Sequence, residues 1–363
     1  MNHKNFTKIL WIAHRDPLHP SAGGAERTIL EVCSRLTSYG IKVTLLTGGW
    51  GNAKKVESLK GIKIMRFGRS VPLHFVLPIH LLLNHYDVVV SDLGHAIPWI
   101  APVLMRKKTV VFFRHLHARS LPGQVNIFLA KLITAIEKTY SIIYRNNTFV
   151  TESTSSIEDL KRMGIKQEKI IKIPPGVDSS LFYPRKKYPV PTIVYFGGMR
   201  RYKRPEHAIL MFKRLQPMVK GIRMKVIGEG PVKPDLIDLA RELGIDDGIE
   251  FIGRLSNQDL AEVLASSWLN VHTSVTEGWG LSVIEASSAG TPTVAYNVPG
   301  ISEVVEQGIN GIRVSDGDIS ALANAALEII SSPEKWWNSS CKVAEKYSWD
   351  RTAQEWYQLI ENY

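Results

Sequence analysis

The sequence contains little that would identify a disulfide-rich, zinc-binding or membrane-spanning protein. Only Cys33 and Cys341 are cysteines among 363 residues. Two isolated thiols without metal-ligand spacing argue against a disulfide scaffold and a zinc site, and they fit a reducing compartment. The apolar runs at 9–13, 71–83 and 96–105 are shorter than the ~18 residues that a bilayer-spanning helix needs. We therefore expect a cytoplasmic protein that is soluble or peripheral at the inner membrane face.

Signatures of cofactor and metal binding are also scarce. The segment GEG at 228–230 is too short for a dinucleotide-binding fingerprint, because no six-residue glycine motif surrounds it. Asp316 and Asp318 flank a glycine, as in a metal-binding Asp-x-Asp motif. They precede an alanine-rich helical stretch, however, where capping the helix is the simpler role for an acidic residue. We expect no metal ion and no cofactor.

Charge is distributed unevenly along the chain, whose net charge is +11. Residues 1–187 contain 28 Lys and Arg against 12 Asp and Glu, which gives +16, whereas residues 188–363 contain 17 against 22, which gives −5. A basic half indicates an anionic partner: nucleic acid, an anionic membrane surface or an acidic acceptor. The alternative is uneven surface charge without a partner. Because the chain has no arginine-rich helix or stacking aromatic motif, nucleic acid is not expected.

Short apolar strands alternate with helical stretches from end to end. Near-continuous apolar strands separated by helices indicate parallel sheets with helices on both faces. The proline-rich segment 173–191 interrupts this alternation, and we interpret it as a linker. The sequence therefore predicts an α/β protein with two doubly wound, Rossmann-like domains, 1–180 and 188–345, that face a cleft. An aromatic helix at 346–363 follows them.

The most informative segment is HTSVTEGWGLSVIEASSAGTPTVA at 272–295. Glu277 and Glu285 are separated by seven residues, which include Gly278 and Gly280 and the start of an apolar helix. A glycine turn before a helix N-terminus aims unpaired N–H groups outward and favours an anion. The two carboxylates suit hydroxyl groups on either side of that anion, such as those of a sugar and a ribose. Glycine spacing, helix end and following strand agree, which disfavours a plain turn with two solvated glutamates.

The stretch EGWGLSVIEA resembles the Glu-x7-Glu signature of the retaining glycosyltransferases of family 4, which have the GT-B fold. The resemblance extends from the glycine-rich loop near residue 23 to the C-terminal helix. It implies metal-independent transfer of a UDP- or GDP-linked sugar to a glycan or lipid-linked acceptor, as in polysaccharide biosynthesis. The first domain would hold the acceptor and the second the donor, and the C-terminal helix would pack back on the first domain.

The resemblance also implies roles for single residues of the second domain. Glu277 would orient the donor sugar, Glu285 would accept hydrogen bonds from the ribose, and Lys203 would neutralise the leaving diphosphate. Gly198 stands where the family has an arginine, so that Arg200 or Arg201 would take this role; a solvated basic loop is the alternative. The remaining expected donor contacts are Leu255 at the nucleobase and Gly278, Trp279, Gly280 and Leu281 at the diphosphate.

In the first domain, Gly23 and Gly24 match the family loop that approaches the diphosphate. Because glycine has no side chain, the backbone at these two residues can approach a ligand closely. Arg114, His115, His117 and Arg119 are expected to point hydrogen-bond donors toward the ligand. His115 matches a family histidine at the donor sugar, and His117 is the alternative. The apolar face of a helix at 125–147 is expected to pack into the core, with a membrane surface as the other option. A nucleotide-sugar epimerase on the same fold is the alternative function.

Overall fold

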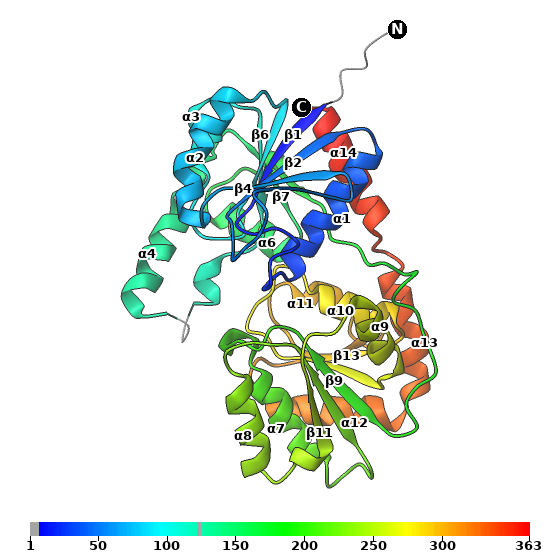
Figure 1. The fold of residues 1–363 in the computed structure, drawn as a ribbon. Helices are drawn as coiled ribbons and strands as arrows, with labels where there is room; N and C mark the ends of the chain where they lie inside the picture. The colour runs from blue at the N-terminus through cyan, green and yellow to red at the C-terminus, as the bar shows by residue number, and fades with distance from the viewer. Residues whose placement is uncertain (1–6, 122–124) are drawn as a thin grey trace. The chain divides into compact units, whose positions relative to one another are not determined.

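The computed structural model describes residues 7–121 and 125–363. The chain divides into two compact units, each described here by itself. Unit 1 comprises Met1–Ala118, Ile127–Pro175 and Trp349–Tyr363, and unit 2 comprises Arg119–Asn126 and Gly176–Ser348. Each unit is an α/β layer structure around its own sheet (Figure 1).

The sheet of unit 1 is parallel except at one edge. Its strands are β1 (Lys8–Ile12), β2 (Lys42–Thr47), β3 (Val56–Leu59), β4 (Ile62–Arg66), β5 (Val88–Asp92), β6 (Thr109–Phe113), β7 (Thr148–Thr151) and β8 (Ile170–Lys172). They lie in the order β3-β4-β2-β1-β5-β6-β7-β8. Only the β3–β4 pair is antiparallel among these described strands. The central strands β5 and β6 are buried along their whole length, as their apolar sequences require.

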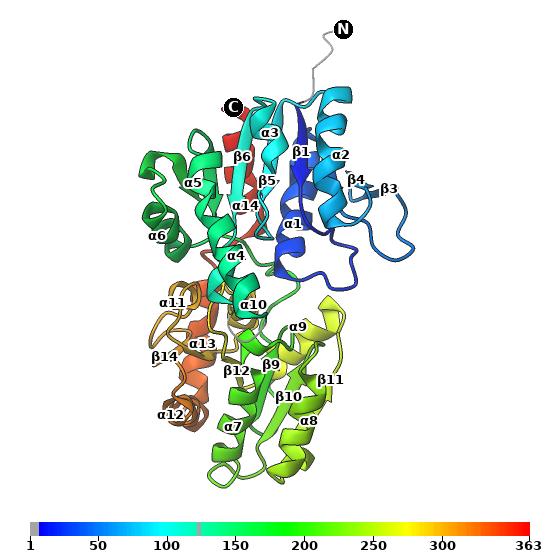
Figure 2. The same ribbon diagram turned by 90° about the vertical axis from the view of Figure 1, so that its left-hand side faces the viewer.

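Helices cover both faces of this sheet. One face packs against α1 (Gly24–Ser38) and the C-terminal α14 (Trp349–Glu361), whose Trp356 ring lies 4.9 Å from Trp11 and 5.1 Å from Phe112. The other face packs against α2 (Ser70–Leu83), α3 (Ile100–Leu104), α5 (Tyr140–Ile143) and α6 (Thr154–Arg162). The helix α4 (Ile127–Lys138) precedes α5 and lies on the same side of unit 1 as α2 and α3 (Figures 1 and 2).

Unit 2 has a fully parallel sheet. Its strands are β9 (Thr192–Phe196), β10 (Arg223–Ile227), β11 (Ile249–Ile252), β12 (Leu269–His272), β13 (Thr293–Tyr296) and β14 (Gly311–Val314), in the order β11-β10-β9-β12-β13-β14. The helix α7 (Pro205–Leu215) packs against α8 (Lys233–Glu242) and α12 (Ile319–Ser331). The helix α10 (Leu281–Ser288) packs against α9 (Asn257–Ser266) and α13 (Pro333–Ala344), and α11 (Ile301–Val304) lies beside it.

Two doubly wound sheets confirm the predicted fold class. The strand order reverses between β1 and β5 in unit 1 and between β9 and β12 in unit 2. In such sheets ligands bind beyond the carboxyl ends of the strands at this reversal. Within the described chain, no helix is both long and apolar enough to cross a bilayer.

Two features differ from the sequence-based expectation. The antiparallel edge strand β3 was not predicted, because its sequence VESL carries no continuous apolar run. The segment 125–147 forms α4 and α5 rather than one helix, and its apolar face does not enter the core throughout. Tyr140 is buried, but Ile127, Leu129 and Leu132 are 63%, 41% and 56% exposed, so the core-packing prediction is wrong for these three residues.

Candidate functional site

The predicted site residues divide between the units. Gly23, Gly24 and His115 belong to unit 1, and all the others belong to unit 2. In unit 2 they lie in the loops after β9 and β12 and on α10, at the sheet reversal, except Leu255, which follows β11.

Two loops of unit 2 are joined to each other at this point. The loop after β9 leads into a short 3₁₀ helix, η3 (Arg201–Lys203), and the loop after β12 begins at Thr273. The Thr273 hydroxyl donates hydrogen bonds of 2.8 Å to the carbonyl oxygens of Lys203 and Arg204. The Val275 amide donates to the Tyr202 carbonyl at 2.9 Å. These bonds fix the position of Lys203 relative to the loop that carries Glu277.

Lys203 and Glu277 form an ion pair between Nζ and Oε1. The Ser274 hydroxyl donates to the same Oε1 at 2.7 Å, and His272 Nε2 lies 3.3 Å from it. Burial by itself would raise the pKa of Glu277, but Lys203 and His272 lower it well below its usual range. Burial would lower the pKa of Lys203, but Glu277 raises it. Both side chains therefore stay charged at neutral pH, while 20% and 16% of their surfaces remain accessible.

The backbone around Glu277 is held from a third loop. Its amide donates to the Pro299 carbonyl at 3.1 Å, and Gly300, with φ +82°, leaves no room for a Cβ beside the Glu277 carbonyl. Arg204, which the sequence analysis did not single out, has φ +47°. It donates to the Thr273 carbonyl at 2.9 Å and forms an ion pair with Asp316. Arg200 and Arg201, the predicted phosphate ligands, are exposed in the same segment.

The helix α10 begins directly after Gly280, as predicted, and ends at Ser288 before Ala289 and Gly290. Gly280 has φ +110°, and a Cβ there would come within 2.9 Å of Ile301 and Val304. Only glycine fits this turn, from which the first N–H groups of α10 emerge without intrahelical acceptors. Glu285 lies in the second turn and is buried.

Trp279, predicted at the diphosphate as part of the 278–282 backbone, presents no side chain to a ligand. Its side chain is 3% exposed and packs into the core of unit 2, with its ring 5.2 Å from that of Tyr347. A contact from Trp279 to the donor would therefore come from its backbone. Gly278 and Leu281 are partly accessible, and Leu255 lies half-buried against the same core after β11.

The glycines after β10 have a packing role. A Cβ on Gly228 would overlap the Gly197 carbonyl, and one on Gly230 would overlap the Met199 carbonyl. The Gly197 amide donates to Ile227 at 3.1 Å, and the Met199 amide donates to Glu229 at 3.0 Å. These glycines let the loops after β9 and β10 run side by side, which accounts for the GEG segment without a dinucleotide. Gly198 is exposed in the first of these loops.

In unit 1, Gly23 is the N-cap residue of α1 and Gly24 its first residue. The Gly23 amide donates to the carboxylate of Glu26 at 2.7 Å, and Arg15 pairs with the other oxygen of Glu26 at 3.0 Å. The helix therefore starts at Gly24, and its glycine loop is exposed.

Arg114 does not point toward a ligand, contrary to the expectation. It is sealed in unit 1, where it pairs with Asp92 and Glu152 at 2.7 Å each and its guanidinium lies 3.8 Å from the Phe112 ring centre. The side chains are 4%, 2% and 7% exposed. Burial would lower the pKa of Arg114, but the two carboxylates raise it, and burial raises the pKa of Glu152.

The two histidines of the predicted His115 site have different surroundings. The rings of His115 and His117 lie 5.1 Å apart and both are partly accessible. His117 Nδ1 lies 3.1 Å from Glu137 of α4, whose carboxylate also accepts from the His117 and Ala118 amides at 2.6 and 3.1 Å. His117 and the start of η1 (His117–Arg119) are thus tied to α4.

The sequence analysis missed a histidine cluster at the reversal of unit 1. His14 follows β1, His95 follows β5 and His74 lies on α2; the His95 ring is 5.1 Å from His14, 5.5 Å from His74 and 4.8 Å from Trp99. Burial and the neighbouring His14 lower the pKa of His95 to about 3. The sequence shows only that His14 and His95 each follow a strand and that His74 lies in an apolar helix. It does not show that these three side chains lie close together.

The predicted helix cap at Asp318 is confirmed, since its carboxylate accepts from the Ala321 amide at 2.8 Å at the start of α12. Within residues 7–121 and 125–363, no group of three or more His, Cys, Asp or Glu side chains is arranged to hold a metal ion.

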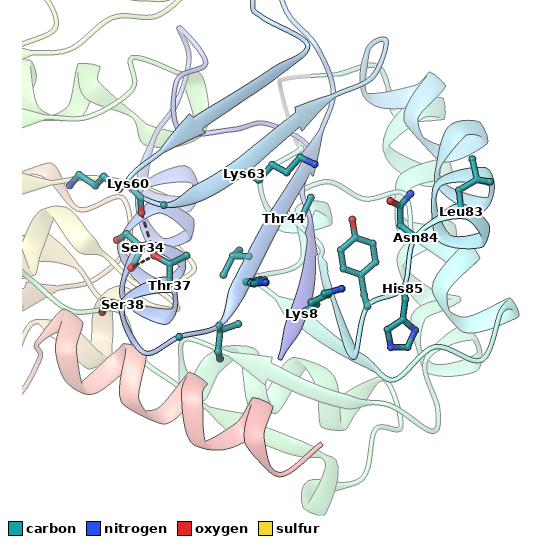
Figure 3. Close-up of a pocket in the computed structure, with 16 residues that line it drawn as sticks. Lys8, Ser34, Thr37, Ser38, Thr44, Lys60, Lys63, Leu83, Asn84 and His85 are labelled. Atoms are coloured by element: carbon teal, nitrogen blue, oxygen red, sulfur yellow. Dashed lines mark hydrogen bonds between the residues drawn. The ribbon is translucent and has the colours of Figure 1, made fainter. Parts of the chain in front are cut away.

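A separate groove of about 900 Å³ lies at the opposite, amino-terminal edge of the unit 1 sheet (Figure 3). Lys8 and Lys42, which begin β1 and β2, line it together with Lys60, Lys63 and the Thr37 hydroxyl. Because parallel α/β sheets bind their substrates at the carboxyl edge, this groove is not the catalytic site.

Comparison with known proteins gives matches over most of the chain. The family described as "Glycosyltransferase Family 4" matches residues 22–181, and "Glycosyl transferases group 1" matches residues 182–346. One subunit of the human phosphatidylinositol N-acetylglucosaminyltransferase is 23% identical over 81% of this chain, which spans 63% of that relative.

Two solved structures have the same fold. Sucrose-phosphate synthase from Thermosynechococcus elongatus aligns with a TM-score of 0.86 at 20% identity, over 98% of each chain. Anabaena HepE, in complex with UDP and glucose, aligns with a TM-score of 0.79 at 18% identity, over 98% of this chain and 100% of that one.

Proposed function

Because this chain belongs to glycosyltransferase family 4, with the GT-B fold, we propose that it moves a sugar from a nucleotide-sugar to a glycan or lipid-linked acceptor with retention at the anomeric carbon. Glycosyltransferase activity follows from the family. What we propose beyond this activity is the class of the donor, the class of the acceptor and the retention of configuration.

One observation carries this proposal: the charged Lys203–Glu277 pair lies at the sheet reversal of unit 2, in the loops beside the glycine turn that opens α10. A cation next to a helix N-terminus suits a diphosphate, because ammonium, N–H groups and helix dipole all favour negative charge. The partial exposure of the pair lets a ligand reach it. We assign the diphosphate to Lys203, to Arg200 or Arg201, and to the backbone at 278–282.

The electrostatics of the pair limit what Glu277 can do. A carboxylate whose pKa lies well below its usual range is a weak base, so Glu277 serves as a hydrogen-bond acceptor for the donor sugar. As the glycosidic bond breaks, negative charge grows on the leaving nucleoside diphosphate, and Lys203 stabilises it. The acceptor hydroxyl attacks on the face that the leaving group vacates and passes its proton to the departing diphosphate, which gives retention without a protein nucleophile.

The substrate classes rest on similarity. HepE was solved with UDP and glucose, and the human relative is named for transfer of N-acetylglucosamine to phosphatidylinositol. We propose a UDP- or GDP-sugar donor for this chain, with Glu285 at the ribose and Leu255 at the base. The acceptor would be held by unit 1, to which Gly23, Gly24 and His115 belong, and the reaction would occur in the cytoplasm.

The first experiment identifies the donor. Thermal unfolding is measured with UDP, GDP and their sugars, since a ligand that binds only the folded state raises the melting temperature. Sugar release or transfer is then compared for Lys203→Ala, Glu285→Ala and the exposed control Arg214→Ala. We expect about a 100-fold loss of kcat for Lys203→Ala, as for removal of one electrostatic stabiliser. Undiminished activity of both site variants would remove the proposed roles.

Metal independence is tested on the same reaction. Because Lys203 and an arginine supply the positive charge, we expect transfer to persist in EDTA and to be unchanged by added Mg²⁺ or Mn²⁺. A loss in EDTA that Mn²⁺ restores would contradict this part of the proposal. The epimerase alternative is not favoured, since both matching families are named as transferases.

A further inference from the structure

Exposed apolar side chains concentrate on one side of unit 1. Thirteen of the twenty large apolar side chains that are exposed in the described residues lie on α2 to α5 or directly before α3. They are Val71, Phe75, Ile79, Leu82, Leu83, Ile97, Ile100, Leu104, Ile127, Phe128, Leu129, Leu132 and Ile142. Exposed apolar side chains gathered in this number on a few neighbouring chain segments mark a site of interaction with a protein or a membrane.

The helix α2 is apolar on both of its faces. Leu73, Leu77 and Leu81 are at most 1% exposed and pack on the sheet. On the opposite face, Phe75 and Leu82 are each 76% exposed. The sequence SVPLHFVLPIHLLL contains no Lys, Arg, Asp or Glu, so the outer face lacks the charged side chains that a solvent-exposed helix face normally has.

The helix α4 carries further exposed apolar side chains and adds positive charge. Phe128 and Leu132, one turn apart, are 80% and 56% exposed, and Lys131 and Lys138 are exposed on the same helix. The helices α2, α3 and α4 lie on the left of unit 1 in Figure 1, and this side faces the viewer in Figure 2. We call the exposed side chains of α2, α3 and α4 the docking face.

Charges around the docking face have one sign. Exposed Arg69 and Arg106 flank α2 and α3, and neither they nor Lys131 and Lys138 pair with a carboxylate in the described chain. The acidic residues nearby are engaged, since Asp92 is sealed by Arg114 and Glu137 holds His117. Positive charge also lies near the end of α2, because Leu83 lines the same groove as Lys8 and Lys63 (Figure 3).

From this arrangement we propose that the docking face binds the surface of an anionic lipid bilayer. Phe75, Leu82 and Phe128 enter the interface, and the surrounding lysines and arginines contact anionic head groups. A second copy of the chain fits less well, because a symmetric contact through this face would bring its positive charges together. The contact is interfacial, since neither α2 nor α4 is long enough to span a bilayer.

Vesicle flotation of the full chain tests the proposal. We expect the protein to float with vesicles that contain phosphatidylglycerol. With vesicles of phosphatidylcholine alone, we expect it to remain in the bottom fraction of the gradient. Phe75→Ser with Leu82→Ser, and separately Phe128→Ser with Leu132→Ser, should each weaken binding at least about tenfold, since each large side chain loses its transfer into an apolar phase. Val56→Ser and Met218→Ser, exposed by 52% and 58% elsewhere, are the matched controls and should bind normally.

Charge reversal tests the electrostatic part. Lys131→Glu with Lys138→Glu should reduce binding, with a loss that added salt brings closer to the wild type. Arg214→Glu with Lys220→Glu, exposed on unit 2, is the control and should retain binding. Unchanged melting temperatures and unchanged UDP or GDP binding show that the variants are folded and that the donor site is intact.

Three results would overturn the proposal. In the first, the wild-type protein does not float with anionic vesicles. In the second, it floats equally well with neutral vesicles. In the third, the α2 and α4 variants bind vesicles as well as their controls do. A wild-type dimer that Phe75→Ser with Leu82→Ser converts to a monomer would instead identify the docking face as a contact between copies. Each of these results leaves the proposed transferase activity standing, because donor binding and sugar transfer are measured without vesicles.

Discussion

The two units share one sheet architecture but use their charges and apolar side chains differently. In unit 1 the ion pairs of Arg114 with Asp92 and Glu152 are at most 7% exposed, whereas the Lys203–Glu277 pair of unit 2 is 20% and 16% exposed. Unit 1 has the exposed apolar helices, whereas the exposed large apolar residues of unit 2 are scattered singly, at Tyr183, Val190, Met218 and Ile309. A sealed ion pair is destabilising to break and has no surface for a ligand, whereas accessible charge at a sheet reversal can bind one.

The largest expected effect comes from the sealed pairs of unit 1. Arg114→Ala leaves two buried carboxylates without their cation, which typically costs about 3–5 kcal/mol in the free energy of unfolding. Urea unfolding of wild type and variant measures this. Lys161→Ala is the control, since Lys161 pairs with Glu158 at 3.0 Å but the two side chains are 40% and 48% exposed, so its loss should cost little. A wild-type unfolding curve for Arg114→Ala would contradict the structural role.

The next effect should appear in activity rather than stability. Glu277→Ala removes the partner of Lys203 and the proposed contact to the donor sugar, so we expect kcat to fall about 100-fold. Glu250→Ala breaks another lysine–glutamate pair of unit 2, with Lys225, but at a carboxylate that is 61% exposed and far along the sheet from β12. This control should keep full activity. Equal losses in both variants would remove the distinction between the two pairs.

Gly280→Ala tests the turn that opens α10. The added Cβ meets Ile301 and Val304 at 2.9 Å in a backbone with φ +110°, so we expect unit 2 to lose about 2 kcal/mol of stability and to bind nucleotide more weakly. Gly308→Ala is matched for positive φ, at +80°, but no atom lies within 4 Å of its Cβ. The difference between the two variants measures the close approach alone. Equal stability and equal nucleotide binding of the two variants would show that the turn can accommodate a Cβ at Gly280.

The smallest effect is a dependence on pH that originates in unit 1. Burial lowers the pKa of His95 to about 3, so between pH 6.5 and 3 the unfolded chain takes up a proton that the folded chain does not. Stability is therefore lost as the pH falls from 6.5 toward 3, whereas at the neutral pH of the other comparisons the effect is close to zero. His95→Phe should flatten the profile measured by urea unfolding at each pH. A variant profile parallel to that of the wild type would contradict this assignment.

Much of the fold and part of the site could be predicted because their determinants are local. Apolar runs gave the strands, and the segment around Gly280 and Gly290 gave both ends of α10, since turns and caps depend on neighbouring residues. The ion pair of Lys203 with Glu277, the sealing of Arg114 and the meeting of His14 with His95 join residues far apart in sequence. Such contacts depend on strand order, which hydrophobic periodicity does not specify.

The burial of single side chains was hard to predict for the same reason. Trp279 lies next to the glycine turn, yet its ring points into the core because Tyr347, at the end of the second unit, packs on it. The apolar residues of α4 suggested a core helix, but no part of the sheet is left to cover Phe128 and Leu132. Periodicity identifies an apolar face, and only tertiary structure shows whether protein covers it.

The central claim is that unit 2 binds a nucleoside diphosphate at the turn before α10. A crystal structure with UDP or GDP bound tests it most directly. We predict the diphosphate against the 278–282 backbone and Lys203, with the Glu285 carboxylate at the ribose hydroxyls. A nucleotide bound at another place, with Lys203 still engaged only by Glu277, would contradict the account.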